Sequence, residues 1–536
     1  MLNVLKKAMA VATAAAITLL PVSPAFAEDG TSTPIKHLVV VFQENVSFDH
    51  YFGTYPHATN PEGEPHFHAA PGTPTVNGLS GGLLTVNPNF LNVTGNGAGA
   101  SNPFRLDRSQ AVTSDQDHNY IDEESAFHAG LMDLFPSKVG TAGPPPAAPP
   151  PVVTTKGLTM GYYDGNTVTA LWNYAQHFAM SDNSFGTTFG PSTPGLLNLV
   201  SGQTNGLTNV LNGTGSETNG GDGSLTVVGD PDPIGDICSN PTRNQVQMAG
   251  KNIGDFLTAA DVTWGSFMGG FDLTVTNANG TAGCKRSSIG LASPAGTADY
   301  VPHHAFFQYH ASTSNPAHTR PASIAEIGHD GRANHNYDIH DFMDAVNAGN
   351  FPAVSFIKAP AFQDGHAGYS DPLDEQTFIV NLVNFLEQTP EWNSTAVVIM
   401  YDDSDGWYDH QMGPIVNQST SPADTLTGPG MCGDGSSALP GPNGNPAAQG
   451  RCGYGPRLPL LVVSPWAKQN FVDHTVTDQS SVVRFVEDNW LDGERIGTGS
   501  FDVLANSITQ MFDFSGENGR AGKLILNPTH GTVVGE

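Results

Sequence analysis

The chain has 536 residues and a formal net charge of −30, from 21 Lys and Arg residues against 51 Asp and Glu residues. Negative charge of this size repels nucleic acid and anionic lipid at long range, so we expect no nucleic-acid partner, and an anionic substrate requires a locally positive site. The length suffices for one large α/β domain with insertions, or for two domains.

The first 27 residues have the pattern of a secretory signal peptide. Lys6 and Lys7 precede an apolar run from Ala8 to Leu20, and the small-residue triplet at positions 25–27 predicts cleavage after Ala27. We therefore expect a secreted or periplasmic protein. No later segment reaches the roughly 18 apolar residues of a membrane helix, so no integral membrane segment is expected.

Four cysteines in an exported chain predict two disulfides, for which three connectivities exist. We favour Cys238 with Cys284 and Cys432 with Cys452, because each pair brackets a Gly-rich segment whose loop entropy a crosslink would reduce. Free thiols or a cysteine metal site are the alternatives, although no C-x-x-C spacing is present.

Strand and helix signals alternate along the chain, which predicts an α/β fold: a doubly wound, mostly parallel sheet with helices on both faces. The predicted strands are short apolar runs rich in Val and Ile, at Ile35–Phe42, Ala353–Ile357, Ala396–Tyr401 and Leu458–Val463. Helices are predicted at Thr167–Gln176, Asp374–Gln388 and Asp478–Trp490, the last with Asp478 as its N-cap. Gly- and Pro-rich insertions are expected near residues 141–151, 202–300 and 420–456 of a single domain that spans residues 28–536.

Oxygen ligands follow two of the predicted strands. Glu44 and Asn45 come after the first strand, and Asp402 and Asp403 come after the third. Because ligands in α/β sheets bind outside the carboxyl ends of the strands, these groups should converge. Three carboxylates at one point repel one another unless a cation lies between them, which indicates a hard divalent metal. The alternative is a pair of ordinary strand-end turns with solvated acids.

The segment "GPSTPG" places Ser192 before an apolar helical pattern, at or near a helix N-terminus. Backbone N–H groups and the helix dipole favour a phosphate or an alkoxide there, so Ser192 is a candidate nucleophile. Serine is also a common N-cap for structural reasons alone.

Four histidines lie in polar turns beside apolar segments: His118, His303, His304 and His366. If they cluster, protonated imidazoles could hold phosphoryl oxygens, and one could protonate a leaving alkoxide. The alternative for each of them is a surface residue.

Five fragments in this order, "ENVSFDHYFG", "GPSTPG", "PHHAFFQY", "HAGYSDP" and "YDDSDGWYDH", resemble the bacterial secreted phosphoesterase family that joins acid phosphatases to phospholipases C, in the alkaline phosphatase-like superfamily. The resemblance runs from about Ile35 to about Trp490. It implies a covalent phosphoenzyme with Ser192 as the nucleophile, the four histidines around the phosphate, and one metal ion held by Glu44, Asn45, Asp402 and Asp403.

Two departures from the phospholipase pattern favour the acid phosphatase branch. Many phospholipases have "ENRSFDHYFG" and a threonine in "GPT", where this chain has Val46 and Ser192, and their second acidic motif often continues "HGG", where this chain has Ser404, Asp405 and Gly406. We therefore expect a broad-specificity acid phosphatase that acts on small phosphate esters.

The alternatives that remain open are a phospholipase C that recognises a phospholipid head group, a sulfuryl-transfer enzyme, and a non-catalytic exported protein that binds calcium. The metal is expected to be Ca, Mg, Mn or Zn, with a histidine ligand favouring zinc or iron. The natural substrate and the oligomeric state are not specified by these patterns.

Overall fold

The computed structural model describes residues 30–149, 152–155, 157–213, 215–220, 223–433, 439, 441–442, 450–516 and 519–535. The predicted signal peptide, with its cleavage after Ala27, lies outside the described residues, as do parts of all three predicted insertions.

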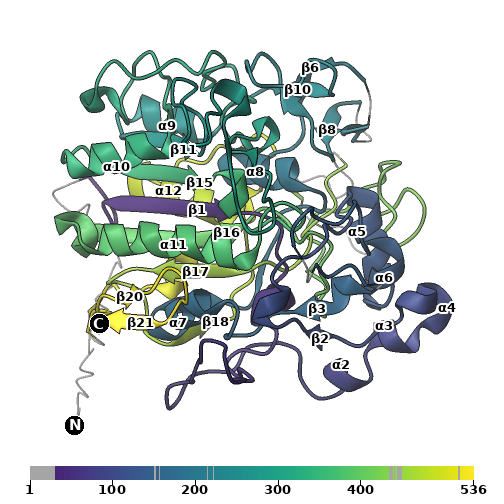
Figure 1. Cartoon of the computed structure of the whole chain (residues 1–536). Helices are drawn as coiled ribbons and strands as arrows, with labels where there is room; N and C mark the ends of the chain where they lie inside the picture. Colours follow the sequence, from purple (N-terminus) through teal and green to yellow (C-terminus); the bar gives the residue numbers. More distant parts are fainter. Residues whose placement is uncertain are drawn as a thin grey trace, which may run out of the picture.

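An eight-stranded sheet forms the centre of the molecule (Figure 1). Every neighbouring pair is parallel except the two pairs that β17 makes, which confirms the predicted mostly parallel α/β sheet. In spatial order the strands are β14 (Asn336–Asp338), β11 (Trp264–Met268), β15 (Val354–Lys358), β1 (His37–Gln43), β16 (Thr395–Tyr401), β17 (Leu460–Val463), β4 (Ala179–Ser181) and β18 (Phe471–Asp473).

Helices cover both faces of this sheet. In Figure 1, α10 and α11 lie in front of the strands, whereas α12 and α8 lie behind them. The last helix begins at Ser480 with Gln479 as its N-cap, so the prediction that Asp478 is the N-cap was wrong by one residue. The Asp478 carboxylate still accepts the N–H of Ser480 at 3.2 Å, which supports the first turn. The larger helices are α7 (Thr169–His177), α8 (Ser192–Ser201), α9 (Ile253–Ala259), α10 (Ile339–Asn347), α11 (Pro372–Glu387) and α12 (Ser480–Trp490).

The main core lies between these helices and the sheet. The apolar side chains of β1 and β16, such as Val39, Val41 and Val397, are completely buried, as expected for strands that are covered on both faces. Full burial of a side chain of this size stabilises the fold by roughly 1.5–3 kcal/mol. The strands that carry the predicted site are therefore held rigidly at the centre of the molecule.

A second core cluster stabilises a helical region beside the sheet, at the lower right of Figure 1. Its helices are short: α2 (Gly82–Thr85), α3 (Pro88–Leu91), α4 (Val93–Asn96), α5 (Tyr120–Phe127) and α6 (Phe135–Lys138).

The other α-helix and the other strands of the described residues are α1 (Phe48–Phe52), β2 (Phe104–Arg105), β3 (Gly161–Tyr162), β5 (Ser184–Phe185), β6 (Leu207–Leu211), β7 (Glu217–Asn219), β8 (Leu225–Val227), β9 (Asp232–Pro233), β10 (Gln245–Met248), β12 (Ser287–Ser288), β13 (Thr297–Ala298), β19 (Thr477–Asp478), β20 (Ile525–Leu526) and β21 (Val533–Gly535).

Both predicted disulfides are present. Cys238 pairs with Cys284 and Cys432 pairs with Cys452, which confirms the favoured connectivity. Within the part of the chain that the structure describes, no helix has the length and apolar character that a membrane crossing requires.

Candidate active site

The carboxyl ends of two adjacent parallel strands, β1 and β16, position the four predicted metal ligands. Gln43 at the end of β1 is in register with Tyr401 at the end of β16, so the residues that follow both strands meet. The backbone N–H of Asn45 donates to Asp402 Oδ1 at 2.9 Å. Asn45 has a φ of 61°, in the left-handed region that asparagine tolerates better than most residues, and the chain turns there toward the site.

Ser192 is the first residue of α8, and its hydroxyl lies among the predicted metal ligands. Its Oγ is 2.9 Å from Glu44 Oε2, 3.2 Å from Asp403 Oδ2 and 3.5 Å from Asn45 Oδ1. Pro191 occupies the N-cap position, so Ser192 does not serve as a conventional helix cap. Gly195 lets the helix approach this closely, because a Cβ atom there would lie 2.3 Å from the carbonyl oxygen of Asp402.

Lys358, the last residue of β15, contacts two of the acids. Its Nζ forms an ion pair with Glu44 and lies 3.4 Å from Asp402 Oδ2. Burial acts to raise the pKa of Asp402, but the Lys358 ammonium and backbone N–H donors outweigh burial and hold this pKa below its ordinary value. Burial and the Asp402 charge raise the pKa of Glu44 well above its ordinary value. One lysine is thus too little positive charge for this cluster.

His118 lies on the other side of the cluster, next to Asp403 and Asp405. Its Nδ1 is 2.9 Å from the carbonyl oxygen of Gln116 and 3.3 Å from Asp405 Oδ1, and its Nε2 faces the Asn45 amide at 3.4 Å. Burial opposes protonation, but the charges of Asp403 and Asp405 outweigh it and raise the pKa of His118 well above its ordinary value. Burial, despite the nearby His118, raises the pKa of Asp403 well above its own.

The other three histidines also lie at the site but differ from His118 in charge. The ring of His366 is 5.9 Å from that of His118, and His304 Nδ1 is 3.2 Å from Glu44 Oε1 with His303 packed against it. Burial lowers the pKa of His303 to about 4 and, together with the neighbouring His303 and Lys358, lowers the pKa of His304 well below its ordinary value. Burial also lowers the pKa of His366. These three imidazoles are neutral near pH 7, in contrast to the expectation of a protonated cluster.

The donor set around Ser192 fits a hard divalent cation. Glu44, Asp403 and Asn45 each direct an oxygen at one point, and carboxylate and amide oxygens are the ligands that such ions prefer. The raised pKa values of Glu44 and Asp403 indicate that Lys358 and His118 do not fully offset the burial and negative charge of this pair. Asp402 differs from the other three predicted ligands, because its Oδ1 already accepts the N–H groups of Asn45 and Asp403.

Sequence reasoning missed Lys358 and Asp364, and it gave Asp405 no defined role. Asp364 is fully buried, with one carboxylate oxygen 4.0 Å from His304 Nδ1, and Asp405 accepts from the Asn45 amide at 3.1 Å. Asp405 stands in the "YDDSDG" motif and could have been included. Lys358 also had a signal, because a lysine that ends a buried apolar strand requires an acidic partner.

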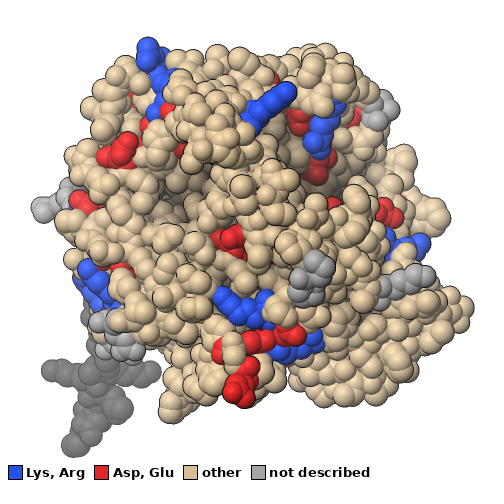
Figure 2. Space-filling view, in the orientation of Figure 1, with Lys and Arg blue, Asp and Glu red and all other residues tan. Residues whose placement is uncertain are grey.

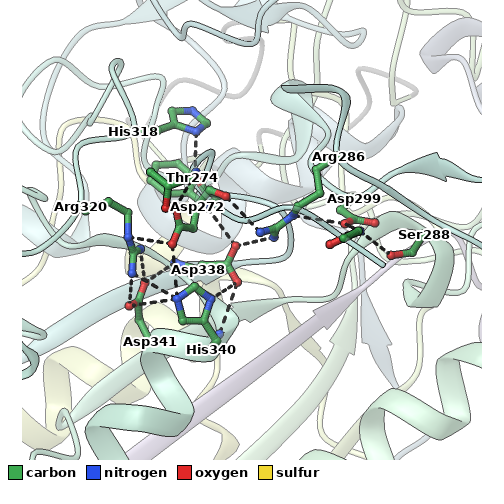
Figure 3. A network of polar contacts seen from close by, with 12 residues as sticks. Asp272, Thr274, Arg286, Ser288, Asp299, His318, Arg320, Asp338, His340 and Asp341 are labelled. Atoms are coloured by element: carbon green, nitrogen blue, oxygen red, sulfur yellow. Dashed lines mark hydrogen bonds and ion pairs between the residues drawn. The ribbon is translucent and has the colours of Figure 1, made fainter. Parts of the chain in front are cut away.

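A second buried cluster of charges lies near the ends of β11 and β14, and we call it the arginine network: Asp272, Arg286, Asp299, Arg320, Asp338, His340 and Asp341 (Figure 3). Arg286 lies between Asp299, at 3.3 Å, and Asp338, at 2.6 Å. Arg320 lies 2.9 Å from Asp272 and also pairs with Asp341. Each acid of this network therefore contacts a cationic side chain.

The family of the chain follows from a comparison with protein-family models. The phosphoesterase family model matches residues 35–491, which include every residue of the candidate active site. The chain belongs to the phosphoesterase family. This confirms the family expected from the five sequence fragments.

Curated relatives of this phosphoesterase are named phospholipases C. It is 24% identical to the non-hemolytic phospholipase C of Pseudomonas aeruginosa, with 92% of this chain and 59% of that protein covered. It is 25% identical to the non-hemolytic phospholipase C of Burkholderia pseudomallei (96% and 65%) and 23% identical to phospholipase C A of Mycobacterium tuberculosis (91% and 78%). The phosphoesterase thus spans less than two thirds of the length of the first two relatives.

Proposed function

We propose that this phosphoesterase is an enzyme of the phospholipase C type, which hydrolyses the phosphodiester of a phospholipid through a covalent phosphoserine at Ser192. The observation that carries the proposal is the position of the Ser192 hydroxyl, within 2.9–3.5 Å of oxygens from Glu44, Asp403 and Asn45. The names of the relatives favour this substrate class over the acid phosphatase expected from the motifs.

The reaction proceeds in two steps. In the first, Ser192 Oγ forms a bond to phosphorus while the bond from phosphorus to the glycerol oxygen breaks, and the serine proton passes to the adjacent carboxylates. His118, protonated at neutral pH and with Nε2 facing the Asn45 side of the site, donates its proton to the departing diacylglycerol. In the second step the oxygen of water bonds to phosphorus while water gives one proton to the now neutral His118. The bond from phosphorus to Ser192 Oγ breaks, Oγ takes back the proton held by the adjacent carboxylate, and the phosphorylated head group leaves.

The donor set of Glu44, Asn45 and Asp403 would hold one divalent cation, which lowers the pKa of the serine hydroxyl and stabilises negative charge on the phosphoryl oxygens. Asp402 stabilises the turn at Asn45 because its Oδ1 accepts the backbone N–H groups of Asn45 and Asp403. Lys358 reduces the repulsion between the carboxylates of Asp402 and Glu44. The neutral histidines His303, His304 and His366 donate their ring N–H groups to the phosphoryl oxygens.

The proposal is tested with a panel of a monoester, a soluble phosphocholine diester and phosphatidylcholine, each with and without chelator. We expect the two phosphocholine substrates to be preferred and the chelator to abolish turnover. Ser192→Ala should lower kcat by at least about a thousandfold, because it removes the nucleophile. Ser201→Ala, on the same helix but bonded to the Leu197 carbonyl, is the matched control and should retain its activity. More than a few per cent of activity in Ser192→Ala would exclude Ser192 as the nucleophile.

A broad-specificity acid phosphatase is the second candidate, favoured by Ser192 in place of threonine and by Ser404, Asp405 and Gly406 in place of "HGG". The same panel separates the two candidates. A monoester rate that exceeds both diester rates at acidic pH would establish the acid phosphatase and overturn the phospholipase C proposal.

A further inference from the structure

In the α2–α4 region several apolar side chains are exposed and several polar side chains are buried, which is the reverse of the usual distribution. Val86, Phe90, Leu91 and Val93 are 54%, 44%, 62% and 61% exposed, although they lie within a short stretch of chain. Scattered exposed apolar residues are normal on proteins, but a group of this kind marks an interaction surface.

Asparagines occupy the interior positions that apolar residues would normally take. Asn87 and Asn89 are fully buried, and the Asn89 amide donates to the carbonyl oxygen of Met132 at 2.8 Å. Asn96 is also buried, and its amide donates to the carbonyl oxygens of Asn89 and Asp133. The amide N–H groups of these three asparagines are thus bonded to protein acceptors and not to water, although Asn96 Oδ1 is buried without a partner among the described residues. Side-chain amides that are bonded inside the protein do not oppose contact of the outer surface with an apolar phase.

The same segment carries no charged side chain. Residues 65–104 contain no Asp, Glu, Lys or Arg, in a chain whose net charge is −30. Figure 2 shows a continuous uncharged surface at the lower right, where Figure 1 places α2, α3 and α4. Electrostatic attraction does not draw the acidic remainder of the protein to a neutral surface. An uncharged face can still make contact with such a surface.

Two further exposed apolar residues lie along the chain between His118 at the candidate active site and Met132, which contacts the α2–α4 region. Ile121 is 45% exposed and stands on α5, which begins two residues after His118. Leu131 is 60% exposed and precedes Met132, whose carbonyl oxygen bonds the buried Asn89. We call Val86, Phe90, Leu91, Val93, Ile121 and Leu131 the apolar face.

We propose that the apolar face docks this enzyme on a zwitterionic phospholipid bilayer, with Leu91 and Val93 inserted between the head groups. The proposal rests on the proposed function, since a phospholipase C must reach its substrate in a lipid surface. Insertion of apolar side chains drives interfacial binding, and the net charge of −30 disfavours an anionic membrane but not a neutral one. The charge-free segment fits phosphatidylcholine better than a charged protein partner.

Binding is measured apart from catalysis, by sedimentation of Ser192→Ala with phosphatidylcholine vesicles. In that background we compare Leu91→Ser/Val93→Ser with a control, Ile237→Ser/Ile289→Ser, whose two residues are each 60% exposed but lie outside the apolar face. We expect the first pair to weaken vesicle binding at least tenfold and the control pair to leave it within twofold. Vesicles with added phosphatidylglycerol should bind more weakly than pure phosphatidylcholine.

The same two double variants are then assayed with serine at position 192. Leu91→Ser/Val93→Ser should hydrolyse the soluble phosphocholine diester at the unmodified rate and lose at least tenfold on vesicles. Unchanged vesicle binding in Leu91→Ser/Val93→Ser would overturn the docking proposal, and so would a dimer that this variant converts to monomer without a change in vesicle binding. If no phosphodiester is hydrolysed but the Leu91 and Val93 dependence of vesicle binding holds, the proposed function fails while the docking surface stands.

Discussion

The candidate active site and the arginine network are both buried groups of acids near the carboxyl edge of one sheet, yet they differ in charge balance. In the arginine network, burial acts to raise the pKa of Asp338, but His340, Arg286 and a backbone N–H outweigh it and lower this pKa to about 2. In the active site the pKa values of Glu44 and Asp403 are raised well above the ordinary range.

The difference teaches that a cluster of acids does not by itself indicate a metal. Arg286 and Arg320 between them pair with all four acids of the network, which therefore acts as a structural connection between the segment around residue 272 and the end of β14. The active site retains an excess of negative charge around a serine hydroxyl. That excess is the property that a cation would satisfy.

The largest expected effect separates the two clusters by metal content. Asp403→Asn should lower the bound divalent metal and reduce kcat by at least about a thousandfold, because a ligand is lost beside Ser192. Asp341→Asn, in the arginine network, should leave metal content unchanged. Elemental analysis and kinetics of both variants check this, and full metal occupancy in Asp403→Asn would refute the ligand assignment.

The next effect is on stability. Arg286→Met should lower the free energy of unfolding by about 3–5 kcal/mol, because it leaves Asp299 and Asp338 buried without their partner. The folded fraction of this variant should have the same kcat as the unmodified protein. Arg484→Met, which removes a partly exposed pair with Asp488, should change stability by less than about 1 kcal/mol. Equal losses in denaturant titrations of the two variants would contradict the structural role of the network.

A smaller effect concerns the pH profile of turnover. Since the pKa of His118 is raised, its proton is retained through neutral pH, and kcat should fall only as pH rises past that raised value. His118→Asn should lower kcat by about a hundredfold and remove the alkaline limb of the profile. A rate that declines already between pH 5 and 6.5 would show that the neutral histidines must be protonated instead.

The smallest effect is the pH dependence of stability. The depressed pKa of Asp338 contributes stability that is present above about pH 4 and is lost as pH falls toward 2, by about 2 kcal/mol. Asp338→Asn should remove this part of the slope, whereas Asp330→Asn, whose side chain is 80% exposed, should not.

In the active site the raised pKa values of Glu44 and Asp403 act in the opposite sense. Metal-free protein should therefore lose stability as pH rises above about 5, and added metal should restore it.

Much of the sheet was predictable from sequence because its central strands are uninterrupted apolar runs rich in Val and Ile. β1, β15, β16 and β17 were all predicted to within two residues at each end. The strands β4, β14 and β18 have three residues each, too few for a periodic pattern, and β11 has the mixed sequence "WGSFM". Their pairing depends on neighbours that are distant in sequence, which local patterns do not record.

The site was predictable in its residue types and less so in its charges. Strand ends and a helix start brought Glu44, Asn45, Asp403 and Ser192 together as expected. The backbone hydrogen bonds of Asp402 and the ion pair of Lys358 depend on burial and register, and so does the difference between His118 and the three neutral histidines. Substrate class was harder still, since the recognised motifs supply groups for a phosphate and a metal and none for a leaving group.

The pairing of β1 with β16 determines when the candidate active site can form during folding. Asn45 and Asp402, which meet at the site, are separated by 357 positions of sequence. A chain that is still emerging from the ribosome lacks the second acidic motif until most of its length is available, and closing so large a loop is slow. The candidate active site can therefore form only as a late event of folding, once the chain as far as Asp403 is available.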